Sequence, residues 1–210
     1  MDENRRPIKT RSAGWARRFT DELVKRDISP NQISVISMLF ALFGAVTLNI
    51  DNGVAGSILC IVSIQLRLLC NLFDGMVAIE GGKQSAVGSL YNEFPDRVAD
   101  SLLIVGLGFA IGQSDLGWFA ALAAALTAYV RVFGGALGLT QSFMGPMAKQ
   151  HRMAVMTVAL LLNVFETLYY ATHYALLIAL VVIALGSVAT CVTRTLAIAR
   201  QLKGNAHVDQ

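Results

Sequence analysis

Residues 71–100 read NLFDGMVAIEGGKQSAVGSLYNEFPDRVAD, and this stretch joins two apolar segments of the chain. Its polar side chains recur with helical spacing on both sides of a glycine-rich turn. Asn71 and Asp74 close the first apolar segment at positions i and i+3, and Asn92 and Asp96 open the second at i and i+4. Each pair therefore lies along one face of a helix. If the two faces meet, they gather oxygen ligands at one boundary of a membrane.

Composition on either side of this stretch predicts an all-α, polytopic membrane protein. Hydrophobic residues make up 55% of the 210 residues and charged residues only 15%, which is too apolar for an ordinary soluble domain. Six apolar stretches are predicted to be transmembrane helices, and most are long enough to cross a hydrocarbon core of roughly 30 Å. These stretches are 32–48, 54–73, 98–111, 116–139, 153–172 and 174–193.

Lysine and arginine are distributed unevenly between the two sides of the predicted bundle. They occur before the first span, between the second and third, between the fourth and fifth, and near the end of the sixth. The other three connections contain neither residue. Because cationic loops are retained in the cytosol, we expect a multi-pass protein of the inner (cytoplasmic) membrane with both termini cytosolic.

The segment before the first span is predicted to be an amphipathic helix on the cytosolic leaflet. Within residues 9–26, Trp15, Phe19 and Leu23 recur at four-residue spacing, and basic residues occupy the other face. Attraction of these residues to anionic lipid accounts for the net charge of +3 without nucleic acid. The predicted organisation is a tail with its juxtamembrane helix, a six-helix transmembrane domain, and a frayed tail (1–29, 30–203 and 204–210).

The polar residues of the quoted stretch are candidates for a chemical site. Acidic and amide groups at membrane depth are costly unless they have partners, so they are functional candidates. A hard divalent cation such as Mg²⁺ or Mn²⁺ prefers carboxylate and carbonyl oxygens and shares them with substrate phosphates. Between the two polar faces lie glycines that allow close approach of the backbone to a ligand, namely Gly75, Gly81, Gly82 and Gly88.

The spacing resembles the motif of the CDP-alcohol phosphotransferase family, D-x2-D-G-x2-A-R-x8-G-x3-D-x3-D. The corresponding residues here are Asn71-x2-Asp74-Gly75-x2-Ala78-Ile79-x8-Gly88-x3-Asn92-x3-Asp96. Members of the family often carry two further small residues, Gly and Ser, within the motif, and these correspond to Gly82 and Ser85. The amphipathic helix, the Pro30-Asn31 start of the first span and the six-helix layout extend the resemblance over most of the chain.

The resemblance implies a membrane transferase of phospholipid synthesis. In this family a CDP-linked donor, usually CDP-diacylglycerol, passes its phosphatidyl group to a small alcohol and releases CMP. The four Asp positions of the family hold two divalent ions, which implies one or two Mg²⁺ or Mn²⁺ ions at Asn71, Asp74, Asn92 and Asp96. By the same resemblance Asp96 is the general base, and the protein is a homodimer. Nucleotide and phosphate groups are expected at Asp74, Gly75, Ala78, Gly82, Ser85 and Gly88.

Three departures from the motif leave a second interpretation open. Asn71 and Asn92 replace the first and third Asp, and Ile79 replaces the Arg. Two negative charges are thereby missing from the expected metal site. The alternative is a catalytically inactive homologue that binds a CDP-linked lipid or a nucleotide. A transporter is disfavoured because its polar residues would be spread over several spans at the midplane.

Basic residues outside the motif are candidates for contact with an anionic acceptor. Arg131 lies inside a predicted span, where a charge is costly, and Lys149 and Arg152 lie in the third cytosolic stretch. Their charge mildly favours a phosphorylated alcohol. Arg67, inside the second span, is expected to snorkel, to pair with Asp74 or to contact substrate.

Overall fold

The computed structural model of the chain describes residues 13–170 and 172–208. This part of the chain forms seven α-helices and no β-strand, which confirms the all-α prediction. The helices are α1 (Gly14–Lys25), α2 (Pro30–Ile50), α3 (Val54–Ile79), α4 (Gly88–Ala110), α5 (Ser114–Ala136), α6 (Lys149–Tyr169) and α7 (Tyr174–Val208).

Five of these helices, α2, α3, α5, α6 and α7, are long and apolar enough to cross a membrane. The chain is therefore a multi-pass membrane protein. Helix α4 contains four charged residues, namely Glu93, Asp96, Arg97 and Asp100. Its composition therefore excludes it from the helices that are apolar enough to cross a membrane. Nevertheless α4 packs against both α2 and α5. The prediction of six spans is thus confirmed for five helices, and α4 as the sixth span stays a prediction.

Large apolar side chains cover the outside of the bundle, as expected of a surface that faces lipid. Examples from three different helices are Phe43, Leu122 and Leu185, each about half exposed or more. The interior is built largely from small residues and flexible ones, such as Ala120 and Met156. Small side chains allow close helix contacts, and the backbones of α4 and α5 approach most closely at Gly108 and Gly117.

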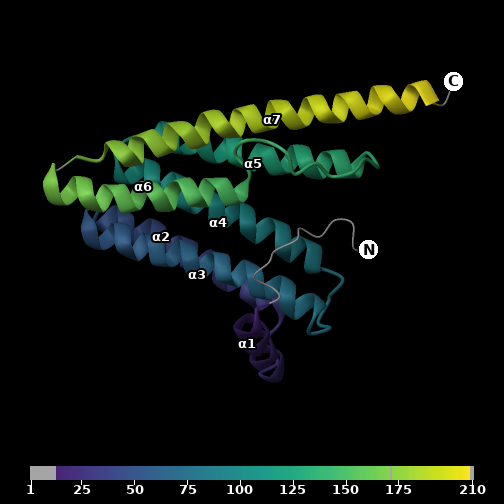
Figure 1. Ribbon diagram of the computed structural model, residues 1–210, viewed down its shortest axis with the longest axis horizontal. Coiled ribbons are helices and arrows are strands. Elements are labelled where there is room, and N and C mark those ends of the chain that lie inside the picture. Colours follow the sequence, from purple (N-terminus) through teal and green to yellow (C-terminus); the bar gives the residue numbers. More distant parts are fainter. Residues whose placement is uncertain (1–12, 171, 209–210) are drawn as a thin grey trace.

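Helices α2 to α7 lie side by side, with α1 set across their direction at one end (Figure 1). The α3–α4 and α5–α6 connections lie toward this same end, as does the end of α7, whereas the α2–α3 and α6–α7 connections lie at the opposite end (Figure 1). This arrangement matches the alternation predicted from Lys and Arg. Which end faces the cytosol stays a prediction from charge.

The helix predicted before the first span is present as α1, which packs against α3. Its position on the cytosolic leaflet stays a prediction. Ala16 and Thr20 are buried on α3, and the rings of Trp15 and Phe19 lie 6.1 and 4.6 Å, centroid to centroid, from the ring of Phe73. Trp15 and Phe19 each remain about half exposed. The predicted helix begins at residue 9, but residues 9–12 lie outside the described part of the chain.

Helix ends differ from the predicted spans where the site lies. A capping box between Ser29 and Gln32 begins α2. Helix α3 continues to Ile79, beyond the predicted end of its span at residue 73, because no proline interrupts it before Gly81 and Gly82. Gly82 has a φ of +65° and turns the chain away from the helix. Helix α7 continues to Val208, into the segment predicted to be a tail from residue 204. The boundary of that tail stays a prediction. No proline interrupts the last turns of α7, and residues such as Leu202 and Lys203 favour helix.

Candidate active site

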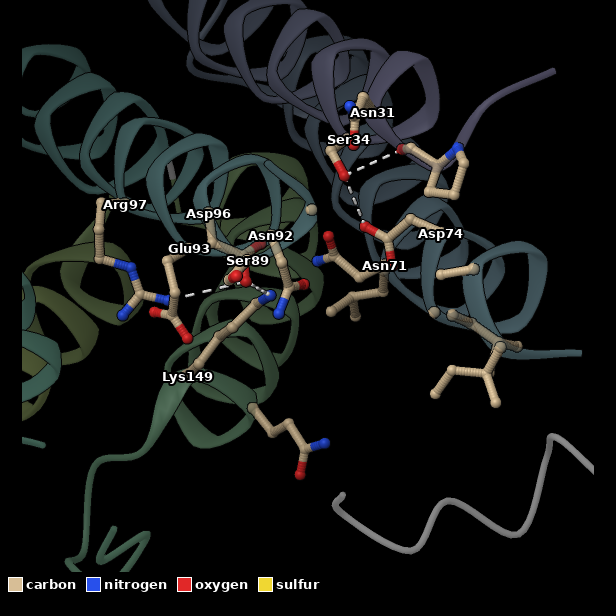
Figure 2. A pocket seen from close by; sticks show the side chains of 18 of the residues that line it. Asn31, Ser34, Asn71, Asp74, Ser89, Asn92, Glu93, Asp96, Arg97 and Lys149 are labelled. Carbon is tan, nitrogen blue, oxygen red and sulfur yellow. Dashed lines mark hydrogen bonds and ion pairs between the residues drawn. The ribbon is translucent and has the colours of Figure 1, made fainter. Parts of the chain in front are cut away.

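A cavity of about 1060 Å³ opens at the end of the bundle that carries the charged residues. Six helices, α2 to α7, contribute to its lining. Figure 2 shows side chains of α3, α4 and α6 converging there, with Asn71 between Asp74 and Asp96. The lining includes the following predicted site residues: Asn71, Asp74, Gly75, Ala78, Ser85, Gly88, Asn92, Asp96, Arg131, Lys149 and Arg152. Gly82 is absent from the lining and shapes the turn that follows α3.

The carboxylate of Asp96 lies at the centre of a cluster of cationic groups. The ammonium of Lys149 contacts its Oδ2 atom directly. The Nη2 atoms of Arg67 and Arg97 lie 3.7 Å from its two oxygens. In the amide orientation that satisfies both neighbours, Asn71 donates to Asp96 Oδ1 at 3.1 Å and accepts from Lys149 Nζ at 2.9 Å. Asp96, the predicted base, is therefore already compensated by protein cations.

Asp74 is held separately, on the α2 side of the cavity (Figure 2). Its Oδ2 accepts a hydrogen bond of 2.9 Å from the Ser34 hydroxyl, and Ser34 also donates to the Pro30 carbonyl at 3.2 Å. The Asp74 side chain is buried yet borders the cavity. Ser34 was not predicted from the sequence, because a serine inside an apolar span normally bonds its own helix backbone.

A buried ion network beneath the cavity joins three helices. Asp100 of α4 accepts hydrogen bonds of 2.6 Å from Arg67 of α3 and from Arg152 of α6. Arg152 also donates to the Met147 carbonyl at 2.8 Å. The interpretation of Arg67 as a partner of Asp74 is therefore wrong, because Arg67 lies about two helical turns before Asp74 in α3 and pairs with Asp100 instead. Because both Nη atoms of Arg152 are engaged within the protein, this residue positions α6. Its contact with an acceptor stays a prediction.

Arg131 and Arg194 form a second basic group on the α5 and α7 side of the cavity. The guanidinium of Arg131 donates to Glu93 at 2.5 Å and to Gln141 at 2.7 Å, and it lies 5.0 Å from the centre of the Phe143 ring. Arg194 donates to two backbone carbonyls, one of which belongs to Met144 at 2.9 Å. From the sequence, Arg194 was used only to predict the orientation of the helices in the membrane. In the folded protein it lines the cavity.

Comparisons with known proteins agree with this fold and motif. No family model matches the chain. The archaetidylinositol phosphate synthase of Pyrococcus horikoshii is 23% identical over 147 residues, which cover 70% of this chain and 76% of the synthase. The chain is therefore similar in sequence to a synthase of the CDP-alcohol phosphatidyltransferase family, whose motif it resembles.

Solved structures show the fold of this family in a mycobacterial protein. The phosphatidylinositol phosphate synthase of Mycobacterium tuberculosis with CDP-DAG bound superimposes with a TM-score of 0.71 at 18% identity, over 89% of this chain and 94% of that one. Its complex with manganese and citrate gives a TM-score of 0.70 at 18% identity, over 87% and 88% of the two chains. Such identities establish a shared fold.

Manganese in that relative raises the question of whether the present site suits divalent ions. Of the four motif positions, only Asp74 and Asp96 carry charge, whereas two divalent ions require about four negative charges for balance. Lys149 and two arginines already compensate Asp96. Among the described residues, no group of three or more His, Cys, Asp and Glu side chains is arranged to hold a metal ion. The residues present therefore do not fit the two-ion site of the CDP-alcohol phosphatidyltransferases.

Other carboxylates do not make up the missing charge. Glu93 pairs with Arg131, and Asp100 is shared between two arginines in the interior. Three basic lining residues were not predicted as site residues, namely Lys83, Arg97 and Arg194. Arg97 follows Asp96 directly in the sequence, which was the only available signal for it.

Proposed function

We propose that the cavity binds CDP-diacylglycerol and that the protein transfers its phosphatidyl group to a phosphorylated alcohol, releasing CMP. The excess of positive charge in the cavity carries this proposal. Among the described lining residues, the cationic ones outnumber the acidic ones: Lys83, Arg97, Arg131, Lys149, Arg152 and Arg194 against Asp74, Glu93 and Asp96. A lipid-linked diphosphate complements such a cavity because anions bind where cationic donors converge.

The position of the cavity also suits a lipid-linked nucleotide. It lies at the ends of apolar helices, and Leu68, Leu69 and Leu72 of α3 contribute to its wall. A lipid donor can therefore keep its acyl chains beside the bundle while its diphosphate enters the cavity. Small residues of the motif, Gly75 and Ala78, leave room for the cytidine close to the backbone of α3.

The proposed reaction is an in-line substitution at phosphorus. The acceptor hydroxyl attacks the phosphorus that bears the diacylglycerol, and the bond from this phosphorus to the bridging oxygen breaks. CMP leaves with the electron pair of that bond, and Asp96 takes the proton of the hydroxyl. Lys149 and Arg97 lie where they can stabilise the negative charge that develops on the leaving phosphate. No step is assigned to a metal ion.

Arg131 is proposed to bind the phosphate of the acceptor. It lines the cavity from α5, and its guanidinium is oriented by Glu93 and Gln141. A planar guanidinium held in this way can bind a phosphate through two parallel hydrogen bonds. The two relatives named above are synthases of phosphorylated inositol lipids, which agrees with a phosphorylated acceptor.

One observation favours a second function, binding of the CDP-linked lipid without transfer. A general base must be free to accept a proton, and the Asp96 carboxylate is contacted by Lys149 and approached by two arginines. Transfer therefore requires Lys149 to turn from Asp96 toward the donor phosphate when the lipid binds. If it stays on Asp96, the protein binds the lipid and releases no CMP.

The experiment that separates the two functions measures CMP release from CDP-diacylglycerol by purified protein with a panel of phosphorylated and free alcohols. Wild type is compared with Asp96→Asn, and binding of CDP-diacylglycerol is measured in parallel. Acceptor-dependent CMP release that is lost in Asp96→Asn, with binding retained, supports the transferase. Binding without CMP release for every acceptor supports the second function, and absence of binding contradicts both.

A further inference from the structure

Lys149, the first residue of α6, has its ammonium among the side chains of the motif. It contacts the Asp96 carboxylate and lies 2.9 Å from the amide oxygen of Asn71. These residues come from three helices, α4, α6 and α3. About a fifth of the Lys149 side chain is exposed, and that part lines the cavity. The ammonium thus occupies a position between a carboxylate and an amide oxygen, the ligand types of a hard cation.

The charges of this group are balanced without a divalent ion. Lys149 carries one positive charge and Asp96 one negative charge, and Asn71 is neutral. A divalent ion bound to Asp96 would lie within a few ångströms of the ammonium, where like charges repel strongly. The arginines near Asp96 would add to that repulsion, since Arg67 and Arg97 each lie 3.7 Å from it. Asn at positions 71 and 92 and Lys at 149 therefore form a mutually compatible set.

We propose that Lys149 replaces a divalent cation in this protein: its ammonium compensates Asp96 and binds the diphosphate of the donor, so that CDP-diacylglycerol binds without metal. The identity of this ligand rests on the function proposed above, whereas the replacement of the metal does not. Lysine is suited to this role because it presents a compact, mobile charge on a flexible stem. The neighbouring Arg97 supplies a second positive charge at the same wall of the cavity.

The proposal predicts opposite responses to chelation in two versions of the protein. Full-length protein in lipid nanodiscs is titrated with CDP-diacylglycerol in EDTA and in Mn²⁺. Wild type is expected to bind with the same affinity, within about threefold, in both conditions. Lys149→Met is expected to bind at least about tenfold more weakly in EDTA, because a charge-assisted contact is lost. Lys149→Arg retains the charge and is the matched control, with binding in EDTA close to that of wild type.

The converse variant combines Asn71→Asp, Asn92→Asp and Lys149→Met, which restores four carboxylates and removes the ammonium. It is expected to bind Mn²⁺, detected by loss of the free-ion signal in electron paramagnetic resonance, and to bind CDP-diacylglycerol at least about tenfold more tightly in Mn²⁺ than in EDTA. Wild type is expected to leave the Mn²⁺ signal unchanged. Size-exclusion profiles and unfolding temperatures establish that each variant is folded.

Two results would overturn the proposal. One is stoichiometric Mn²⁺ binding by wild type that is lost in Asp96→Asn. The other is CDP-diacylglycerol binding by wild type that disappears in EDTA. Failure of wild type to bind the lipid in either condition contradicts the proposed function alone. The Mn²⁺ signal then decides the present proposal: a site gained only in the triple variant supports it, and no gain contradicts it.

Discussion

Arg67 and Asp100 form a buried ion pair at 2.6 Å that joins α3 to α4 just beneath the cavity. The Arg67 side chain is completely buried, and the second oxygen of Asp100 binds Arg152 at 2.6 Å. Two guanidinium groups thus share one carboxylate in the interior of the bundle. This pair keeps the two halves of the motif, on α3 and α4, at a fixed separation.

Replacement of Asp100 by Asn is therefore expected to destabilise the protein strongly. Removal of one partner leaves buried charges without compensation, which costs about 3–5 kcal/mol for an ordinary buried pair. Thermal unfolding in detergent would measure the loss. Asp115→Asn is the matched control, because Asp115 is an exposed acid at the start of α5, and this change should leave the unfolding temperature nearly unaltered. Equal stability of both variants would contradict the structural role of Asp100.

Replacement of Arg131 by Gln tests the proposed acceptor site. Loss of a charge-assisted contact to phosphate should raise the KM for a phosphorylated acceptor by about tenfold or more. The KM for CDP-diacylglycerol should change little, because the donor is proposed to contact Lys149, Arg97 and the small residues of α3. Steady-state CMP release at varied acceptor concentration measures both values. Arg200→Gln, an exposed change outside the cavity lining, is the control, and an unchanged acceptor KM in Arg131→Gln would refute the assignment.

The contact between the α2–α3 turn and the first turn of α3 requires glycine at position 56. A Cβ atom there would lie 1.7 Å from the Asp51 carbonyl oxygen. We expect Gly56→Ala to lower the free energy of unfolding by at least about 1–3 kcal/mol, as overpacking does elsewhere. Gly14→Ala serves for comparison, since a Cβ atom at Gly14 meets nothing within 4 Å. Chemical denaturation of both variants in the same detergent would show whether only the first is destabilised.

Asp51, in the same turn, predicts a dependence of stability on pH. The backbone N–H groups of Gly56 and Gly53 donate to its carboxylate and lower its pKa below the ordinary value of 3.8. The stabilisation is therefore fully present above that ordinary value and is lost as pH falls through the lowered pKa. Wild type should exceed Asp51→Ala in unfolding temperature at about pH 7, and the two should converge below about pH 3. A difference that is constant with pH would exclude a role for the charged carboxylate.

Local sequence predicted several parts of this protein correctly. Apolar runs predicted the five helices that are long and apolar enough to span a membrane, and the spacing of Trp15 and Phe19 predicted α1. The motif predicted which segments line the cavity, because its helical spacing places Asn71 and Asp74 on one face and Asn92 and Asp96 on another. These features depend on periodicity and composition, which can be read from one segment at a time.

Partners of charged residues could not be predicted in this way. Arg67 lies 33 positions from Asp100, and Lys149 lies 53 positions from Asp96. Spacing within a segment carries no information about such pairs. The helical continuation of α7 to Val208 was also missed, because polar composition after residue 203 was interpreted as fraying.

The sequence by itself determined that this protein is a helical, multi-pass membrane protein with polar residues at one end of its helices, since apolar length and helical period are local properties. The sequence also shows that two carboxylates of the motif are missing, because Asn71 and Asn92 stand at the first and third Asp positions. Only the tertiary structure decided that Lys149 compensates Asp96 and that Asp100 is shared by Arg67 and Arg152. Electrostatic pairing depends on distances of a few ångströms between helices, and the packing of the whole bundle sets those distances.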